Sequence, residues 1–312
     1  MKFRLLVVTL ILCSLAPSLC AQTPAGSESD ISESVTTIRA SVQEVNVFFT
    51  ATDKRGKFRK DLQASDLAVL DDGKPPAAVR SFRSETDLPL RVGLVIDSSG
   101  SVTDRFAFEQ ESAIHFVNEI LRPKVDQAFV VTFASTPKLQ QDFTDDIGLL
   151  ARAARSTNAG GGSAVYDAVA LAANRKLANL WGERPVRRVI ILLSDGEDNQ
   201  SSTTRPQVIE AARRSGVTVY TISTNISNVI TRGDKVLQRL ADETGGRAFY
   251  PNKISDVVNA FRTIEEELRS QYAVAYKPAE FIADGRYRSI NIQARNKDVF
   301  IRARKGYFAP KD

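Results

Sequence analysis

Cysteine and histidine are almost absent from this chain of 312 residues, which contains two cysteines and one histidine. Both cysteines, Cys13 and Cys20, lie near the N-terminus, so the remainder offers no thiol for catalysis, for disulfides or for zinc–thiolate sites. The single histidine, His115, would have to serve any Ser-His-Asp arrangement. It lies beside Phe116 in an amphipathic helical stretch, where we expect a surface or half-buried residue without a catalytic role.

Sequence motifs of the common hydrolases and nucleotide-binding enzymes are also missing. The chain has no P-loop, no H-E-x-x-H and no G-x-S-x-G motif. We therefore predict a protein that is not an enzyme. Metal-assisted hydrolysis of phosphate or carboxylic esters stays open as an alternative, because bound Mg²⁺ can act as a Lewis acid.

A strong net charge is lacking as well. Lysine and arginine number 42 against 37 aspartates and glutamates, and the net charge of +5 is spread along the chain. This balance gives no reason to expect a nucleic-acid partner. The basic residues between 286 and 305 are interpreted as the solvated face of a sheet, where they protect its edge from aggregation. A hydrophobic content of 43% predicts one large or two modest globular domains.

The only long apolar run opens the chain, and it is shorter than the roughly 20 residues that a membrane-spanning helix needs. Lys2 and Arg4 precede the run Leu5–Leu12, and Pro17 ends it before the small residues of "SLCAQ". This is the pattern of a secretory signal peptide, which we place at residues 1–21. We expect an exported protein without a transmembrane segment, located in the periplasm, on the envelope or outside the cell.

Two short β-rich segments flank a longer α/β region. After a polar stretch at 22–35, which is predicted to be a flexible linker, residues 36–86 alternate apolar and polar side chains between turn signals. Residues 271–312 return to the same pattern. Each segment has too few strands to close a core alone. We therefore expect the two segments to form one small β-sandwich, with residues 87–270 inserted between them.

The central region, residues 87–270, alternates buried strands with amphipathic helices. The apolar runs "LRVGLVID", "DQAFVVTFAS", "VRRVIILLSD" and "VTVYTISTN" are separated by stretches with apolar residues at helical spacing. Such βα units predict the α/β class, with a doubly wound and mostly parallel sheet. Ligand sites in these sheets lie beyond the carboxyl ends of the strands.

Three polar loops are predicted to meet at that edge. Asp97 ends the first buried strand, within "DSSGS", and Asp195 follows another strand, within "SDGED". Ser163 lies between a run of glycines and the start of a helix, in "GGGSAVYDAV". Aspartate and hydroxyl oxygens are hard donors, which suit Mg²⁺, Mn²⁺ or Ca²⁺.

The "DSSGS" stretch resembles the D-x-S-x-S motif of von Willebrand factor type A domains, which carry a metal-ion-dependent adhesion site. The threonine of that family's second loop falls on Ser163, a serine that keeps the hydroxyl and loses the methyl group, and the family's later aspartate falls on Asp195. The resemblance covers roughly residues 90–269. The metal contacts that it implies are Asp97, Ser99, Ser101, Ser163 and Asp195.

The same resemblance implies a protein partner whose acidic side chain completes the metal's coordination. The flanks, including "SVQEVNVFFTATDKRG" and "RARKGYF", resemble those of secreted A-domain proteins described from Acidobacteria. We therefore predict a secreted or envelope-associated binding protein that engages its partner through a divalent cation. The alternative is a structural envelope scaffold in which the metal only stabilises the fold.

A purely structural role for these loops is the competing interpretation. Serine and aspartate before a helix are also good N-caps. Two aspartates at one sheet edge would repel each other without a cation, which favours a metal. Two further acids lie nearby: we expect Asp198 to cap or solvate its own loop and Asp167 to anchor the glycine-rich loop, with neither as a ligand.

Overall fold

The computed structural model describes residues 44–311, except 85–87, 103–105, 179, 181–185 and 226–228. The predicted signal peptide, the linker and the first residues of the N-terminal β segment therefore lie outside the described residues. Within the part of the chain that is described, no helix is long and apolar enough to cross a membrane.

The elements follow the predicted order of a β segment, an α/β region and a second β segment. The first segment contains β1 (Val45–Thr52), the 3-10 turn η1 (Ala64–Asp66), β2 (Leu67–Asp71) and β3 (Ala78–Ser84). The central region contains β4 (Leu90–Asp97), the 3-10 turn η2 (Gly100–Val102), α1 (Phe106–Ile120), β5 (Gln127–Phe133), β6 (Pro137–Thr144), α2 (Ile147–Arg155), α3 (Val165–Ala170), the π-helical stretch η3 (Leu171–Leu177), β7 (Arg187–Ser194), α4 (Arg205–Arg214), β8 (Thr218–Ser223), α5 (Arg232–Thr244), β9 (Ala248–Phe249) and α6 (Ile254–Leu268). The last segment contains β10 (Tyr272–Lys277), β11 (Tyr287–Ala294), β12 (Phe300–Ala303) and β13 (Gly306–Phe308).

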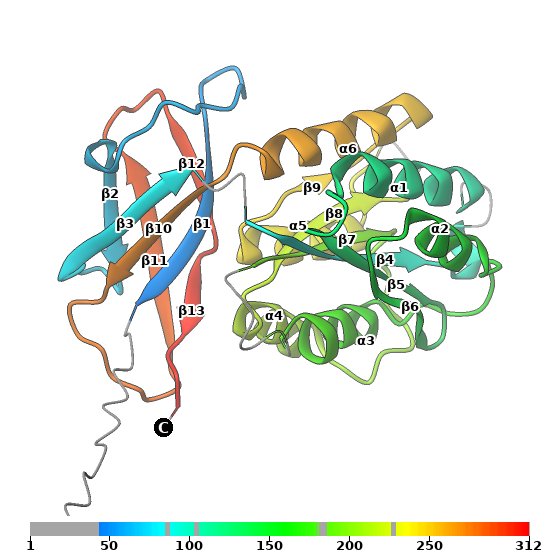
Figure 1. The fold of residues 1–312 in the computed structure, drawn as a ribbon. Coiled ribbons are helices and arrows are strands. Elements are labelled where there is room, and N and C mark those ends of the chain that lie inside the picture. Colours follow the sequence, from blue (N-terminus) through cyan, green and yellow to red (C-terminus); the bar gives the residue numbers. More distant parts are fainter. Residues whose placement is uncertain are drawn as a thin grey trace, which may run out of the picture. The chain divides into compact units, whose positions relative to one another are not determined.

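The central sheet has the strand order β6-β5-β4-β7-β8-β9, with helices on both of its faces (Figure 1). Its pairings are parallel except for β6, which runs antiparallel to β5. Alternate residues of β4 enter two separate cores: Leu94 packs with Phe116 and Phe261 of α1 and α6, and Val95 packs with Val169 of α3. The predicted doubly wound, mostly parallel sheet is confirmed.

The flanking strands form two antiparallel sheets, with the orders β12-β1-β10-β3 and β13-β11-β2. Both sheets combine strands from the two ends of the sequence: β1 pairs with β10 in the first sheet, and β2 pairs with β11 in the second. Their shared core includes Val47, Val69 and Ile290, and the rings of Phe49 and Tyr272 stack with their centroids 5.4 Å apart. The flanking β-sheets of the predicted fold class are therefore present.

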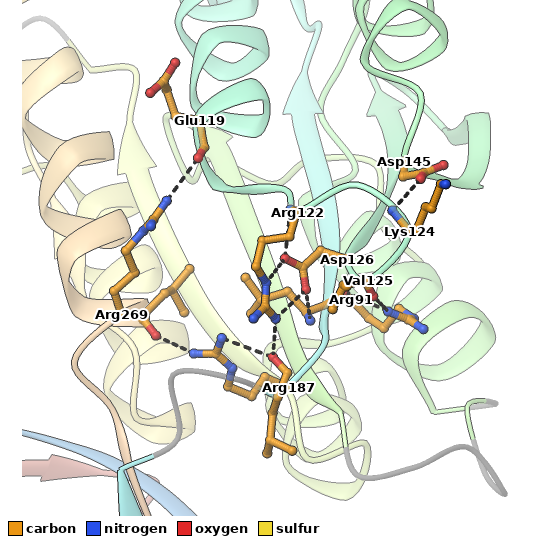
Figure 2. Close-up of polar contacts among 12 residues, drawn as sticks. Arg91, Glu119, Arg122, Lys124, Val125, Asp126, Asp145, Arg187 and Arg269 are labelled. Atoms are coloured by element: carbon orange, nitrogen blue, oxygen red, sulfur yellow. Dashed lines mark hydrogen bonds and ion pairs between the residues drawn. The ribbon is translucent and has the colours of Figure 1, made fainter.

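A buried polar cluster holds the amino-terminal edge of the central sheet (Figure 2). Asp126 accepts a hydrogen bond from Arg122 Nε at 2.8 Å. The guanidinium groups of Arg122 and Arg187 both donate to the carbonyl oxygen of Leu88, and Arg187 also donates to that of Leu268. Leu88 lies just before β4 and Leu268 ends α6, so this cluster fixes the points where the chain enters and leaves the central region.

Candidate metal centre

Asp97 lies at the carboxyl end of β4, and only 1% of it is exposed to solvent. Its Oδ1 accepts a hydrogen bond from the backbone N–H of Ser99 at 2.8 Å. Its Oδ2 accepts one from Ser194 Oγ at 2.7 Å and a long one from Ser163 Oγ at 3.5 Å. Asp97 thus brings together hydroxyl groups from loops that are far apart in the sequence.

The "DSSGS" loop is held against its neighbours by its backbone. Ser98 donates both its N–H and its hydroxyl to the carbonyl oxygen of Phe133 at the end of β5. This leaves Ser99 and Ser101 to face each other, with their Oγ atoms 3.1 Å apart. Ser99 is buried and Ser101 is exposed, so the pair of hydroxyls runs from the interior to the surface.

The glycine-rich loop brings Ser163 to the same edge. Gly100 donates its N–H to the carbonyl oxygen of Gly161, and Gly160 donates to that of Ser98. Gly161 adopts φ of +85°, a conformation that residues with a Cβ rarely take. Ser163 itself is buried, and its N–H donates to Asn199 Oδ1 at 3.0 Å, which ties this loop to the one after β7.

Asp195 begins the loop after β7 and is partly exposed. Its Oδ1 accepts the N–H of Glu197 at 3.0 Å, and its Oδ2 accepts no hydrogen bond from the described residues. The loop fits closely against the first turn of α5, because a Cβ added to Gly233 would lie 2.1 Å from the carbonyl oxygen of Asp195. One carboxylate oxygen of Asp195 therefore stays available to a ligand.

Burial, hydrogen bonds and a neighbouring charge all act on the Asp97 carboxyl group. Burial raises the pKa of Asp97, and the hydrogen bonds from Ser99 and Ser194 lower it in part. The negative charge of Asp195 raises the pKa of Asp97 further. The protein thus places two acidic groups within electrostatic reach and supplies hydroxyls around them, with no cationic side chain among the contacts of Asp97 that the structure describes.

This donor set fits a hard divalent cation. Asp97 and Asp195 supply carboxylates, and Ser99, Ser101 and Ser163 supply neutral hydroxyls, which match the oxygen ligands of Mg²⁺, Mn²⁺ and Ca²⁺. Among the described residues, no group of three or more histidine, cysteine, aspartate or glutamate side chains could hold a metal. A site here would therefore depend on hydroxyls for most of its protein ligands.

Ser194 was not predicted from the sequence, although it makes the shortest side-chain hydrogen bond to Asp97. Its Oγ also accepts the N–H of Gly196 at 2.9 Å, so it fixes Asp97 and the Asp195 loop together. The alternation of side chains along the strands gives the position of Ser194 once the pairing of β4 with β7 is known. Leu192 and Val95 point into the same core, so Ser194 and Asp97, each two residues later, fall on the same face of the sheet.

The two neighbouring acids differ from each other. Asp198 accepts a hydrogen bond from Ser201 Oγ at 2.6 Å, as expected of an acid that caps its own loop. The prediction that Asp167 anchors the glycine-rich loop is wrong, because its carboxylate accepts the N–H groups of Ser202 and Thr203, in the loop after β7. His115 is exposed on α1, as predicted.

Comparison with known proteins identifies the family. A family model of the von Willebrand factor type A domain matches residues 92–263, which is more than half of the chain. The chain belongs to this family. Calcium-activated chloride channel regulator 1 of Bos taurus is 32% identical over 180 residues, which make up 55% of this chain and 19% of that protein. Calcium-activated chloride channel regulator 3A-1 of Mus musculus is 29% identical over 201 residues, or 62% of this chain and 20% of that protein. The chain thus spans about a fifth of the length of these relatives.

Solved von Willebrand factor type A structures share the fold. A von Willebrand factor type A structure from Catenulispora acidiphila has a TM-score of 0.52 at 12% identity, covering 86% of this chain and 74% of that one. Proximal thread matrix protein 1 from the mussel byssus was solved with zinc in its MIDAS (metal-ion-dependent adhesion site) motif. It has a TM-score of 0.51 at 18% identity, covering 63% of this chain and 50% of that one. At these identities the likeness establishes the fold alone.

Proposed function

We propose that this von Willebrand factor type A protein is an exported binding module that holds a protein ligand through a divalent cation. The cation would be held by Asp97, Ser99, Ser101, Ser163 and Asp195, directly or through water. The observation that carries the proposal is the buried Asp97 carboxylate, which lies within electrostatic reach of a second carboxylate and near hydroxyls from two loops and from the end of β7.

The charge of this donor set indicates what the cation would do there. Five protein oxygens, if all bound directly, would leave one position of the octahedral Mg²⁺ shell open, and two carboxylates do not exceed the charge of the ion, so they do not exclude an anionic ligand from that position. An acidic side chain of a partner protein would fill it. Mg²⁺ is our first choice of ion, and Mn²⁺ and Ca²⁺ are compatible with the same oxygens.

Export is supported by the leader pattern at residues 1–21. We place the protein in the periplasm, on the envelope or outside the cell. Catalysis is not part of the proposal, because the chain lacks the hydrolase motifs and its one histidine, His115, is on α1. The second candidate function is a structural scaffold, in which the cation stabilises the domain without binding a partner.

Chelator-reversible capture tests the proposal. Immobilised wild-type protein and the Ser163→Ala variant would be exposed to envelope and extracellular fractions of the source cells in Mg²⁺ or Mn²⁺, and then eluted with EDTA. We expect a protein that only the wild type retains and that EDTA releases. Retention that EDTA does not affect would contradict metal-mediated binding. A metal-stabilised protein that captures nothing would favour the scaffold.

A further inference from the structure

The described parts of the connection between β8 and α5, residues 224–225 and 229–231, adjoin the Asp195 side of the candidate site. At its start, Thr224 donates its N–H to the carbonyl oxygen of Ser194 at 3.0 Å. At its end, Gly233 fits against the Asp195 carbonyl and donates its N–H to Glu197 Oε1 at 3.1 Å. Side chains just before Gly233 are therefore neighbours of the metal-site loop.

Two adjacent apolar side chains are exposed in this loop. Val229 is 69% exposed and Ile230 is 53% exposed, and Val229 has the greatest exposure of the large apolar residues that the structure describes. Both line a cavity of about 110 Å³, whose other walls are Ser223, Asn225, Asp234, Tyr250 and Asn252. Apolar side chains that adjoin each other in water, beside a cavity, are typical of a surface that another molecule covers.

Arg232 adds a positive charge next to this apolar pair. It is exposed, and its guanidinium has no hydrogen-bond or ion-pair partner among the described residues, whereas most of the described arginines have one. A cation in the first turn of α5 opposes the helix dipole, so helix stability does not explain its position.

Arg232 directly precedes Gly233, whose backbone fits against the Asp195 carbonyl. Burial and the charge of Asp198 raise the pKa of Tyr166, whereas the charges of Arg205 and Arg232 lower it. Tyr166 lies in the first turn of α3, directly after the Ser163 loop. Arg232 and Tyr166 therefore lie within electrostatic reach of each other.

We propose that Val229, Ile230 and Arg232, here named the β8–α5 surface, select the protein ligand. The preferred ligand carries a bulky apolar side chain and a second acidic side chain beside the carboxylate that reaches the metal. The apolar side chain packs on Val229 and Ile230, and the second carboxylate pairs with Arg232. This inference rests on the proposed function, because it names the class of ligand for the same site.

A displayed library of short peptides, with one fixed aspartate and random neighbours, tests the inference. Full-length wild-type protein would be selected against the library in Mg²⁺, in Mn²⁺ and in EDTA. With metal, we expect peptides with leucine, isoleucine or phenylalanine and a second acid near the fixed aspartate to be enriched by about tenfold, the contribution of one well-placed contact.

Variants separate the two parts of the surface. The double variant Val229→Ser, Ile230→Ser should lose the apolar preference and keep the acidic one. Arg232→Glu should lose the acidic preference and keep the apolar one. Because an acid is favourable at a helix N-terminus, the loss in Arg232→Glu cannot be attributed to a weakened α5.

Matched controls are available on the same domain. Val258→Ser removes an apolar side chain that is 53% exposed on α6, and Arg239→Glu reverses an exposed charge two turns further along α5. Both should leave the selected peptides unchanged.

The possible failures can be distinguished. Selection could depend on metal but show no preference for residues near the fixed aspartate, or show a preference that the variants retain. Either result overturns the role of the β8–α5 surface and is still consistent with the metal site. Selection that is the same in EDTA, or no selection at all, overturns the proposed function and this inference with it.

Discussion

At the scale of single residues, a buried aspartate stands at each edge of the central sheet, and the two have opposite environments. Asp126 lies at the amino edge, where burial alone would raise its pKa, but the hydrogen bonds from Arg122 and the Leu90 N–H lower it below the ordinary value. Asp97 lies at the carboxyl edge, where burial and Asp195 raise its pKa. Asp126 has a guanidinium as its cation, whereas the described contacts of Asp97 are hydroxyls, the Ser99 N–H and the like charge of Asp195, with no cationic side chain. This is the environment that the proposed metal would complete.

The Asp126 environment predicts how stability depends on pH. A carboxyl group whose pKa is lowered by folding stabilises the protein above its unfolded pKa, which is near 3.8, and this contribution is lost as the pH falls through the folded pKa. Asp126→Asn should therefore cost about 1–2 kcal/mol at pH 7, because it removes the charged acceptor of Arg122 and of the Leu90 N–H, and the cost should be smaller at pH 3, below the unfolded pKa. Urea denaturation at several pH values measures this. An equal cost at both pH values would contradict the assignment.

At the scale of elements, the sequence predicted the parts that are apolar and regular. The four central runs became β4, β5, β7 and β8 because their residues are buried on both faces. The edge strand β6 and the helix α2 were not predicted. The β6 sequence "PKLQQDFT" is half exposed and mostly polar, so it carries no clear alternation, and tertiary pairing with β5 decides its conformation.

The candidate site, too, could be predicted from the sequence only in part. Asp97, Ser163 and Asp195 could be placed at one edge because parallel strands end there, and the structure brings Asp97 and Ser163 into contact through side chains. Ser194 could not be recognised without the pairing of β4 with β7, which sets the phase of the two strands. The β8–α5 surface has no sequence signature, because exposure of Val229 and Ile230 is a property of the folded loop.

Close packing within β4 gives a prediction at this scale. A Cβ added to Gly93 would lie 2.5 Å from Cζ of Phe129 on the neighbouring strand β5, where Phe129 is fully buried. Gly93→Ala should lower the free energy of unfolding by about 1–3 kcal/mol through overpacking. The matched change Gly148→Ala, in the exposed first turn of α2, would bring the Cβ to 3.1 Å from Oδ1 of the exposed Asp146 side chain, which can move, so we expect an effect of about 0.5 kcal/mol or less. Equal effects in chemical denaturation would show that the contact is not tight.

At the scale of the whole molecule, the β-sandwich depends on both ends of the sequence. Strand β10 lies between β1 and β3, and β2 pairs with β11, so the three N-terminal strands have no pairings with one another in the described sheets. Their apolar faces are covered by strands that lie more than 170 residues later in the sequence. We therefore propose that the sandwich forms only when the C-terminal segment is present.

Deletion of residues 271–312 tests this dependence. The shortened protein should aggregate, and residues 44–84 should become sensitive to proteases, because the inner face of the N-terminal strands is exposed. We propose that residues 87–270 fold as one domain, so this part should stay protease-resistant. Limited proteolysis followed by mass spectrometry measures both regions. A soluble shortened protein in which residues 44–84 are protected would contradict the paired sandwich.

The most direct test of the metal site compares thermal melting of wild-type protein and Asp195→Asn, in EDTA and in Mg²⁺ or Mn²⁺. Without metal, the variant should be as stable as the wild type or slightly more stable, because Asp195 no longer repels the buried Asp97. With metal about 100-fold above its Kd, the wild type should gain about 2–3 kcal/mol and melt at a higher temperature, whereas the variant should barely respond. An equal metal-induced shift of the melting temperature in both proteins would contradict the account. So would a variant that is less stable than the wild type in EDTA, together with a wild-type melting temperature that metal does not change.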